Sequence, residues 1–169
     1  MEKNLVLQPK NIKLPTACIY LDQNNIFFRY KKLDFKKLIE KLKDQYNIIS
    51  ATSYMALDHN QDAQKKFVTY IVNNGWKCQT VDVSINTNID GMIVYDMTND
   101  YQNKKPDSVI LISGDGDYAY PLDQLSKKGA NIFVIGAKDF TSIELLKVAD
   151  RKMYLEEFSN VILEVNKES

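Results

Sequence analysis

Short apolar runs alternate along the chain with longer segments in which apolar residues recur at helical spacing. The runs predict strands that are buried on both faces of a sheet. These strands are expected at 17–21, within 48–57, and at 76–83, 109–112, 132–135 and 153–158. The spaced segments predict helices at 35–42, 61–73, 90–97, 117–128 and 141–148. This alternation predicts an α/β fold, with a mostly parallel sheet of five to six strands and helices on both faces.

Residues that start and stop helices stand at several of these boundaries. Asp34 can cap the first helix, and Asn73-Asn-Gly75 can end the second. Thr141-Ser-Ile-Glu144 has the pattern of a capping box for the last helix. The chain thus carries local signals that agree with its hydrophobic pattern.

The length of 169 residues predicts one domain with a sizeable core. We expect an arm at 1–16, a folded domain at 17–158 and a C-terminal tail at 159–169. The arm contains a short strand-like piece, Leu5-Val-Leu7, followed by Pro9, Ile12 and Pro15. It could pack on a sheet edge, mediate a homodimer or stay disordered, and its apolar residues favour the first two.

Hydrophobic content of 44% and charged content of 26% are ordinary for a soluble protein. No apolar run reaches the ~20 residues that span a membrane, and the start lacks a signal-peptide core, so we expect a cytoplasmic protein with no membrane partner. Cys18 and Cys78 are interpreted as buried thiols, and His59 as a solvated loop residue. A single histidine excludes His-rich zinc sites. The net charge of zero argues against strong salt-driven binding to nucleic acid without excluding such a partner.

Aspartates follow two of the predicted strands directly. Asp22 follows the first strand, and Asp115 and Asp117 follow the fourth. These strands are commonly neighbours in a doubly wound sheet, where ligands bind beyond the carboxyl ends. Two carboxylates about 4 Å apart repel by roughly 4 kcal/mol at an effective dielectric near 20, which a cation would relieve. Asp90 and Asp96, on the helix after the third strand, could join them.

Each aspartate also has an ordinary interpretation. Asp90 and Asp117 could be helix caps, Asp96 could lie on a solvated helix face, and Asp22 could start a turn. The convergence of strand-end acids on predicted neighbours favours a shared site over these separate explanations.

Four blocks of the chain, in order, resemble the NYN domain, a branch of the PIN-like nuclease superfamily. The blocks are Leu21-Asp-Gln-Asn-Asn25, Ile89-Asp-Gly-Met-Ile-Val-Tyr-Asp96, Ile112-Ser-Gly-Asp-Gly-Asp-Tyr118, and Thr141-Ser-Ile-Glu-Leu145 with Ala149-Asp150. The resemblance covers roughly 17–158 and implies a Rossmann-like three-layer α/β/α fold that hydrolyses single-stranded or structured RNA with a metal ion. The acidic metal and catalytic set that it implies is Asp22, Asp90, Asp115 and Asp117.

The resemblance also implies polar residues that orient the substrate: Asn25, Ser113 and, as the second acid of its block, Asp96. One position departs from the family pattern. Thr87 stands where members often carry a lysine. A missing cation beside the carboxylates could weaken phosphate binding or alter substrate choice.

Oxygen ligands favour Mg²⁺ or Mn²⁺, and without a histidine pair the economical mechanism is water activated by metal. Two alternatives remain open from the sequence. One is a non-catalytic regulatory or RNA-binding module that keeps the acidic pocket. The other is a phosphotransfer protein with an acceptor aspartate at Asp22.

Overall fold

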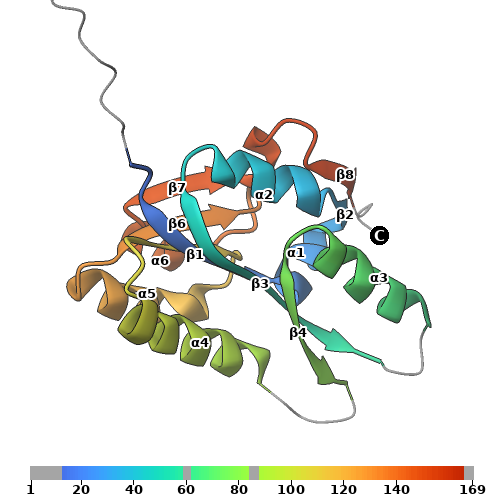
Figure 1. The fold of residues 1–169 in the computed structure, drawn as a ribbon, viewed down its shortest axis with the longest axis horizontal. Helices are drawn as coiled ribbons and strands as arrows, with labels where there is room; N and C mark the ends of the chain where they lie inside the picture. The colour runs from blue at the N-terminus through green and yellow to red at the C-terminus, as the bar shows by residue number, and fades with distance from the viewer. Residues whose placement is uncertain (1–12, 59–61, 84–87, 166–169) are drawn as a thin grey trace, which may run out of the picture.

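The computed structural model describes residues 13–58, 62–83 and 88–165. Its centre is a six-stranded sheet in which every pairing is parallel (Figure 1). The strands lie in the order β4 (Lys77–Asp82), β3 (Asn47–Leu57), β1 (Thr16–Asp22), β5 (Ser108–Ile112), β6 (Asn131–Gly136) and β7 (Arg151–Tyr154). The predicted α/β architecture is confirmed, including the pairing of the first predicted strand with the fourth.

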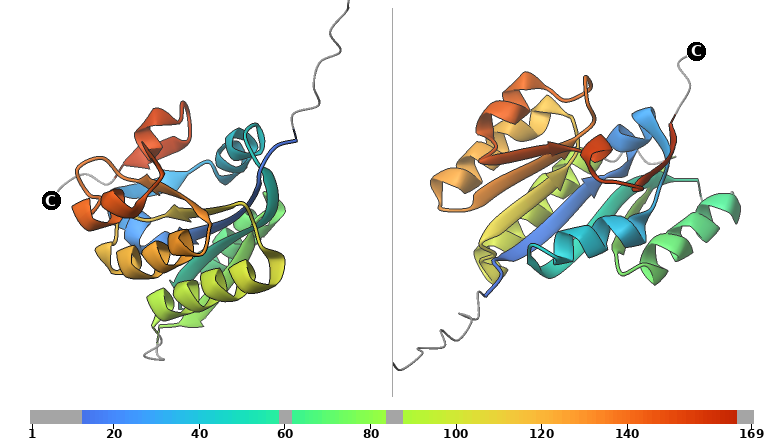
Figure 2. Two further views of the ribbon diagram at one scale, coloured as in Figure 1. Left: turned by 90° about the vertical axis from the view of Figure 1, so that its left-hand side faces the viewer. Right: turned by 90° about the horizontal axis from the view of Figure 1, so that it is seen from above.

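Helices cover both faces of the sheet and complete three layers (Figure 2). One face carries α1 (Gln23–Arg29), α2 (Phe35–Lys43) and α3 (Asp62–Asn73). The other carries α4 (Ile89–Lys104), α5 (Ala119–Lys127) and α6 (Ile143–Val148). The sheet therefore separates two hydrophobic cores.

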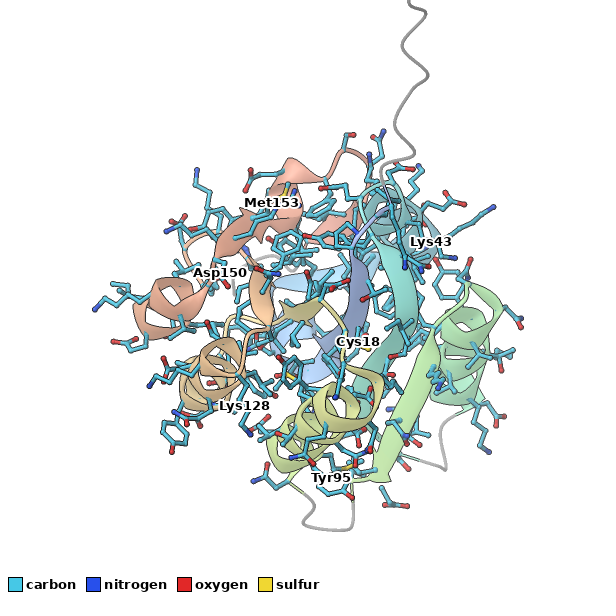
Figure 3. All side chains as sticks on the ribbon, turned by 60° about the vertical axis from the view of Figure 1, so that its left-hand side comes forward. Cys18, Lys43, Tyr95, Lys128, Asp150 and Met153 are labelled. Atoms are coloured by element: carbon cyan, nitrogen blue, oxygen red, sulfur yellow. The ribbon has the colours of Figure 1, made fainter. Side chains whose placement is uncertain are left out.

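Successive residues of β1 point alternately into these two cores. Ile19 and Leu21 pack in the core beneath α2 and α3. Cys18 and Tyr20 pack in the core beneath α4, where Cys18 lies close to that helix (Figure 3). Side chains alternate across a strand, so a central strand covered on both faces needs apolar residues at every position. That explains the unbroken apolar runs of the sequence.

Residues just after β1 form elements that the hydrophobic pattern did not predict. Asp22 caps the short helix α1, and β2 (Tyr30–Leu33) follows it. β2 pairs antiparallel with β8 (Ile162–Val165), inside the segment expected as a tail. This small second sheet joins chain segments more than 100 residues apart, which no local pattern can indicate.

Two element boundaries also differ from those expected. The helix expected at 90–97 runs as α4 to Lys104, and Asn88 rather than Asp90 caps it. The strand expected at 153–158 ends at Tyr154 and gives way to the 3₁₀ helix η2 (Leu155–Glu157). The last helix is capped by Ser142, one residue later than the start of the expected capping box.

Some expectations fall outside the described residues: His59, Thr87 and most of the arm, at 1–12. Within the described ranges, Cys18 is buried and Cys78 half-buried, and both are free thiols. No helix in these ranges is both long and apolar enough to cross a membrane.

Candidate metal centre

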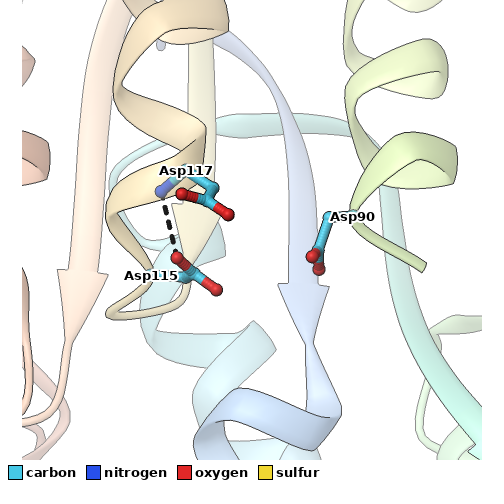
Figure 4. A group of neighbouring side chains, drawn as sticks. All are labelled: Asp90, Asp115 and Asp117. Carbon is cyan, nitrogen blue, oxygen red and sulfur yellow. Dashed lines mark hydrogen bonds between the residues drawn. The ribbon is translucent and has the colours of Figure 1, made fainter. Parts of the chain in front are cut away.

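Three aspartates from two segments converge beyond the carboxyl ends of β1 and β5. Asp90 lies in the first turn of α4, and Asp115 and Asp117 lie in the loop after β5. One carboxylate oxygen from each residue can be chosen so that all three lie within 4.8 Å of one another (Figure 4). Asp90 and Asp115 are half-buried and Asp117 is exposed, so the group opens to solvent. We call these three residues the acidic cluster.

The loop after β5 holds its two acids through its own hydrogen bonds. Ser113 Oγ accepts the N–H of Asp115 at 3.1 Å, and Asp115 Oδ1 accepts the N–H of Asp117 at 3.0 Å. The second contact caps the 3₁₀ helix η1 (Gly116–Tyr118). One oxygen of Asp115 is therefore engaged within its own loop, and the other accepts none of the hydrogen bonds found among the described residues.

Contacts between loops fix this segment from outside. Asn25 Oδ1, on α1, accepts the N–H of Gly114 at 2.8 Å, and the carbonyl of Gly114 accepts the N–H of Ser142 at 2.9 Å. A Cβ at position 114 would collide with the carbonyl oxygen of Phe140. The loops after β1, β5 and β6 are thus interlocked around a glycine that leaves no room for a side chain.

Asp22 is placed differently from the three clustered acids. It is only 3% exposed and accepts the N–H of Asn25 at 3.1 Å and the hydroxyl of Ser113 at 3.3 Å. The hydroxyl of Tyr118 also lies 3.1 Å from Asp22 Oδ2, and its one proton is shared between Asp22 and Asp90. Both of its oxygens are engaged. Among the described residues the group of three does not include it.

Burial raises the pKa of Asp22 above its ordinary value, and the nearby charge of Asp90 adds to the rise. The hydrogen bonds from Asn25, Tyr118 and Ser113 act in the opposite direction because they favour the ionised carboxylate. Asp22 is therefore a buried, hydrogen-bonded carboxylate next to the cluster, and a nearby cation would help to keep it ionised.

Tyr118 connects Asp22 to the cluster. Its fully buried hydroxyl lies 3.1 Å from Asp22 Oδ2 and 2.9 Å from Asp90 Oδ1. Burial and the negative charges of Asp22 and Asp90 raise the pKa of Tyr118 far above its ordinary value, so the hydroxyl keeps its proton as a donor. The sequence motif contained Tyr118, but nothing in the local pattern showed that it bridges two acids.

Asp96 does not join the acidic cluster. Its Oδ2 accepts the hydroxyl of Tyr54 at 2.7 Å, and Asp100 accepts that of Tyr20 at 3.0 Å. With Tyr118 and Asp90, these pairs make three buried tyrosines that each donate to an aspartate of α4. Asp96 thus belongs to the contacts that attach α4 to the sheet.

The donor set of the cluster fits a hard divalent cation. Each pair of carboxylates at this separation repels by about 3 to 4 kcal/mol at an effective dielectric near 20. Carboxylate oxygens are the ligands that Mg²⁺ and Mn²⁺ prefer, and Mg²⁺ is usually held by few carboxylates with water and substrate filling the remaining positions. The open side at Asp117 leaves space for those further ligands.

Comparisons with known proteins agree with the fold and with the motif blocks. The family model of the NYN domain matches residues 16–156. The low amplitude and bright protein LabA of Synechococcus elongatus is 25% identical over 162 residues, covering 85% of this chain and 86% of that protein. A crystal structure of a protein of unknown function from Vibrio parahaemolyticus has a TM-score of 0.77 at 21% identity, covering 91% of this chain and 99% of that one. At that identity it supports the fold alone. Because the family match runs from β1 through β7, the chain belongs to the NYN domain family.

Proposed function

We propose that this protein is a metal-dependent ribonuclease whose site lies at the carboxyl ends of β1 and β5. The observation that carries the proposal is the acidic cluster. Asp90, Asp115 and Asp117 converge at the strand ends of an NYN domain, where α/β sheets bind their ligands. A Mg²⁺ or Mn²⁺ ion bound there would polarise the scissile phosphate and lower the pKa of an attacking water.

The residues of the chain divide into ligands and supports. Asp90 and Asp115 would hold the ion from opposite segments, and the exposed Asp117 would bind it further or orient the water. Asp22 would act from behind them, through Tyr118 or through an intervening water. The four acids of the predicted set therefore lie in two different environments. Asp22 is buried and hydrogen-bonded, whereas Asp90, Asp115 and Asp117 are half-buried or exposed.

Two polar residues beside the acidic cluster hold the loop after β5 in place. Asn25 fixes the backbone of Gly114, and Ser113 joins Asp22 to Asp115. We assign both residues to holding the carboxylates in place. We assign Asp96, which accepts from Tyr54, to holding α4 rather than to substrate.

A second function competes with this one. A regulatory module could keep the acidic cluster and bind a cation or RNA without cleaving it. The neutral net charge and Thr87 in place of the family lysine favour that alternative. It predicts that Mn²⁺ binds and that RNA is never hydrolysed.

One experiment separates the two functions. Single-stranded and structured RNA are incubated with wild type and Mn²⁺, with wild type and chelator, and with Asp115→Asn and Mn²⁺. A nuclease cleaves only in the first condition. Asp62→Asn is the matched control, because this exposed aspartate lies on α3 across the sheet from α4 and α5. Equal cleavage in all conditions would refute the nuclease, and calorimetric Mn²⁺ binding without cleavage would support the regulatory module.

A further inference from the structure

Two exposed phenyl rings and a guanidinium group lie together on the surface. Phe28, at the end of α1, is 77% exposed, and Phe140, between β6 and α6, is 41% exposed. Their ring centroids are 6.5 Å apart at an interplanar angle of 59°. The guanidinium carbon of Arg29 lies 4.7 Å from the centroid of the Phe140 ring. We call these three residues the aromatic platform.

The platform does not serve the hydrophobic core. The adjacent Phe27 is half-buried, and its ring lies 5.3 Å from that of Phe67 on α3. Phe28 turns outward instead and keeps most of its surface in water. A large apolar side chain exposed to this extent contributes little to folding, and exposed aromatic rings gathered beside a site often indicate binding.

The backbone of the platform is joined directly to the loop of the acidic cluster. Asn25, one helical turn before Phe28, accepts the N–H of Gly114. The carbonyl of Phe140 packs against Gly114, immediately before Asp115. The platform and the cluster therefore share one supporting framework at the same end of the sheet.

We infer that the aromatic platform binds an unpaired base of RNA next to the scissile phosphate at the acidic cluster. This inference rests on the proposed function and adds to it a separate site for an unpaired base. Bases that are free of a duplex stack on phenyl rings and on arginine planes, whereas duplexed bases are already stacked on one another. Arg29, whose side chain also hydrogen-bonds Tyr30, adds a positive charge to the platform, where the three carboxylates would otherwise repel a flanking phosphate.

Binding is measured on the full chain by fluorescence anisotropy, with Ca²⁺ as the divalent ion. The probes are labelled oligoadenylate, an abasic oligomer of the same length and an RNA duplex. Phe28→Ala and Phe140→Ala should each weaken oligoadenylate binding by about 5- to 100-fold, the loss typical of one base stack. Phe28→Tyr should restore the affinity, because it restores a ring. Abasic oligomer and duplex should bind equally weakly to all of these proteins.

Tyr95→Ala is the matched control. Tyr95 is 69% exposed on α4 (Figure 3). This helix covers the face of the sheet opposite α1, and Tyr95 lines a pocket there together with Gln79 of β4. Its substitution should leave oligoadenylate affinity unchanged. An equal loss in this variant would overturn the inference, because the effect would then be a general one of surface aromatics.

The remaining outcomes separate this inference from the proposed function. Metal-dependent cleavage with unchanged affinity in Phe28→Ala would refute the platform and leave the nuclease intact. Ring-dependent oligoadenylate binding without cleavage would support the platform and refute the nuclease. Loss of self-association in Phe28→Ala, with RNA binding unchanged, would refute the platform by identifying the surface as a protein interface.

Discussion

The buried hydroxyl of Tyr118 donates a hydrogen bond of 2.9 Å to Asp90. The same oxygen lies 3.1 Å from Asp22, and a phenol has only one proton to share between the two acceptors. Through this group the end of β1, the loop after β5 and the start of α4 meet at one point. The position of Asp90 in the acidic cluster therefore depends on a residue that is not itself an acid.

Tyr118→Phe removes this hydroxyl and keeps the buried ring. We expect the fold to persist and Mn²⁺ affinity to fall about tenfold, because hydrogen bonds to charged groups contribute about 1.5–3 kcal/mol. Calorimetry with Mn²⁺ measures the change. Tyr20→Phe is the control, since Tyr20 donates to Asp100 on the same helix outside the cluster. An equal loss of affinity in both variants would show that Tyr118 acts only by attaching α4.

Asp115→Asn removes one charge from the cluster and preserves the cap of η1, because asparagine also accepts the N–H of residue 117. We expect the metal-free variant to be more stable than wild type by at least about 1 kcal/mol, because it loses both repulsive pairs that Asp115 forms, with Asp90 and with Asp117, although solvent at the open side screens much of that repulsion. Mn²⁺ should raise the unfolding temperature of wild type and not that of the variant. A Mn²⁺-induced rise of equal size in both would contradict the assignment of Asp115 as a ligand.

Tyr54 and Asp96 should be coupled in stability and not in metal binding. Tyr54→Phe and Asp96→Ala each break the 2.7 Å hydrogen bond that attaches α4 to β3. A double-mutant cycle from urea unfolding should give a coupling free energy of about 1–2 kcal/mol. Mn²⁺ affinity should stay unchanged in all three variants. A loss of RNA cleavage in Asp96→Ala at wild-type metal affinity would instead restore Asp96 as a substrate-orienting residue.

Gly114→Ala tests the interlocked loops. The added methyl group would collide with the carbonyl of Phe140, and overpacking of this kind costs about 1–3 kcal/mol of unfolding free energy. Gly91→Ala is a sharp control, because its Cβ would lie no closer than 3.5 Å to Asn88 in the first turn of α4. That variant should be stabilised by about 0.5–1 kcal/mol. Thermal unfolding measures both changes, a lower unfolding temperature in Gly114→Ala and a higher one in Gly91→Ala.

The carboxylate of Asp107 should make the unfolding free energy of the protein depend on pH in the acid range. Its carboxylate accepts the hydroxyl of Thr16 at 2.7 Å and the N–H of Thr16 at 2.8 Å, and these bonds lower the pKa of Asp107 below its ordinary 3.8. Because the pKa of Asp107 is lower in the folded state than in the unfolded state, its contribution to stability is fully present at pH values above the unfolded-state pKa. That contribution is lost as the pH falls through the folded-state pKa. Asp107→Asn should therefore be less stable than wild type at neutral pH, and the gap should close in acid. Urea unfolding at both pH values measures it, and a gap independent of pH would contradict this linkage.

Local patterns account for most of the sheet. Runs such as Val109–Ile112 are apolar at every position because both faces of a central parallel strand are covered, so their state and burial were predictable. The position of Asp115 and Asp117 at the end of this strand followed directly from the sequence. By contrast, α1 has polar and aromatic residues without a helical stripe, and its formation depends on the cap by Asp22 and the burial of Ile26.

The order of the main strands and helices, the placement of acids at strand ends and the family blocks could all be read from the sequence, whereas α1, β2 and β8 could not. The features that could be read are properties of neighbouring residues, set by side-chain period and by helix caps. The packing of the layers, by contrast, brings Asp90 to Asp115 and Asp117, and it places Asp22 in a buried network with Tyr118. It also brings Asp96 to Tyr54 and Phe28 to Phe140. Such contacts join segments far apart in the chain, and their geometry is fixed by how the layers pack rather than by the residues beside them.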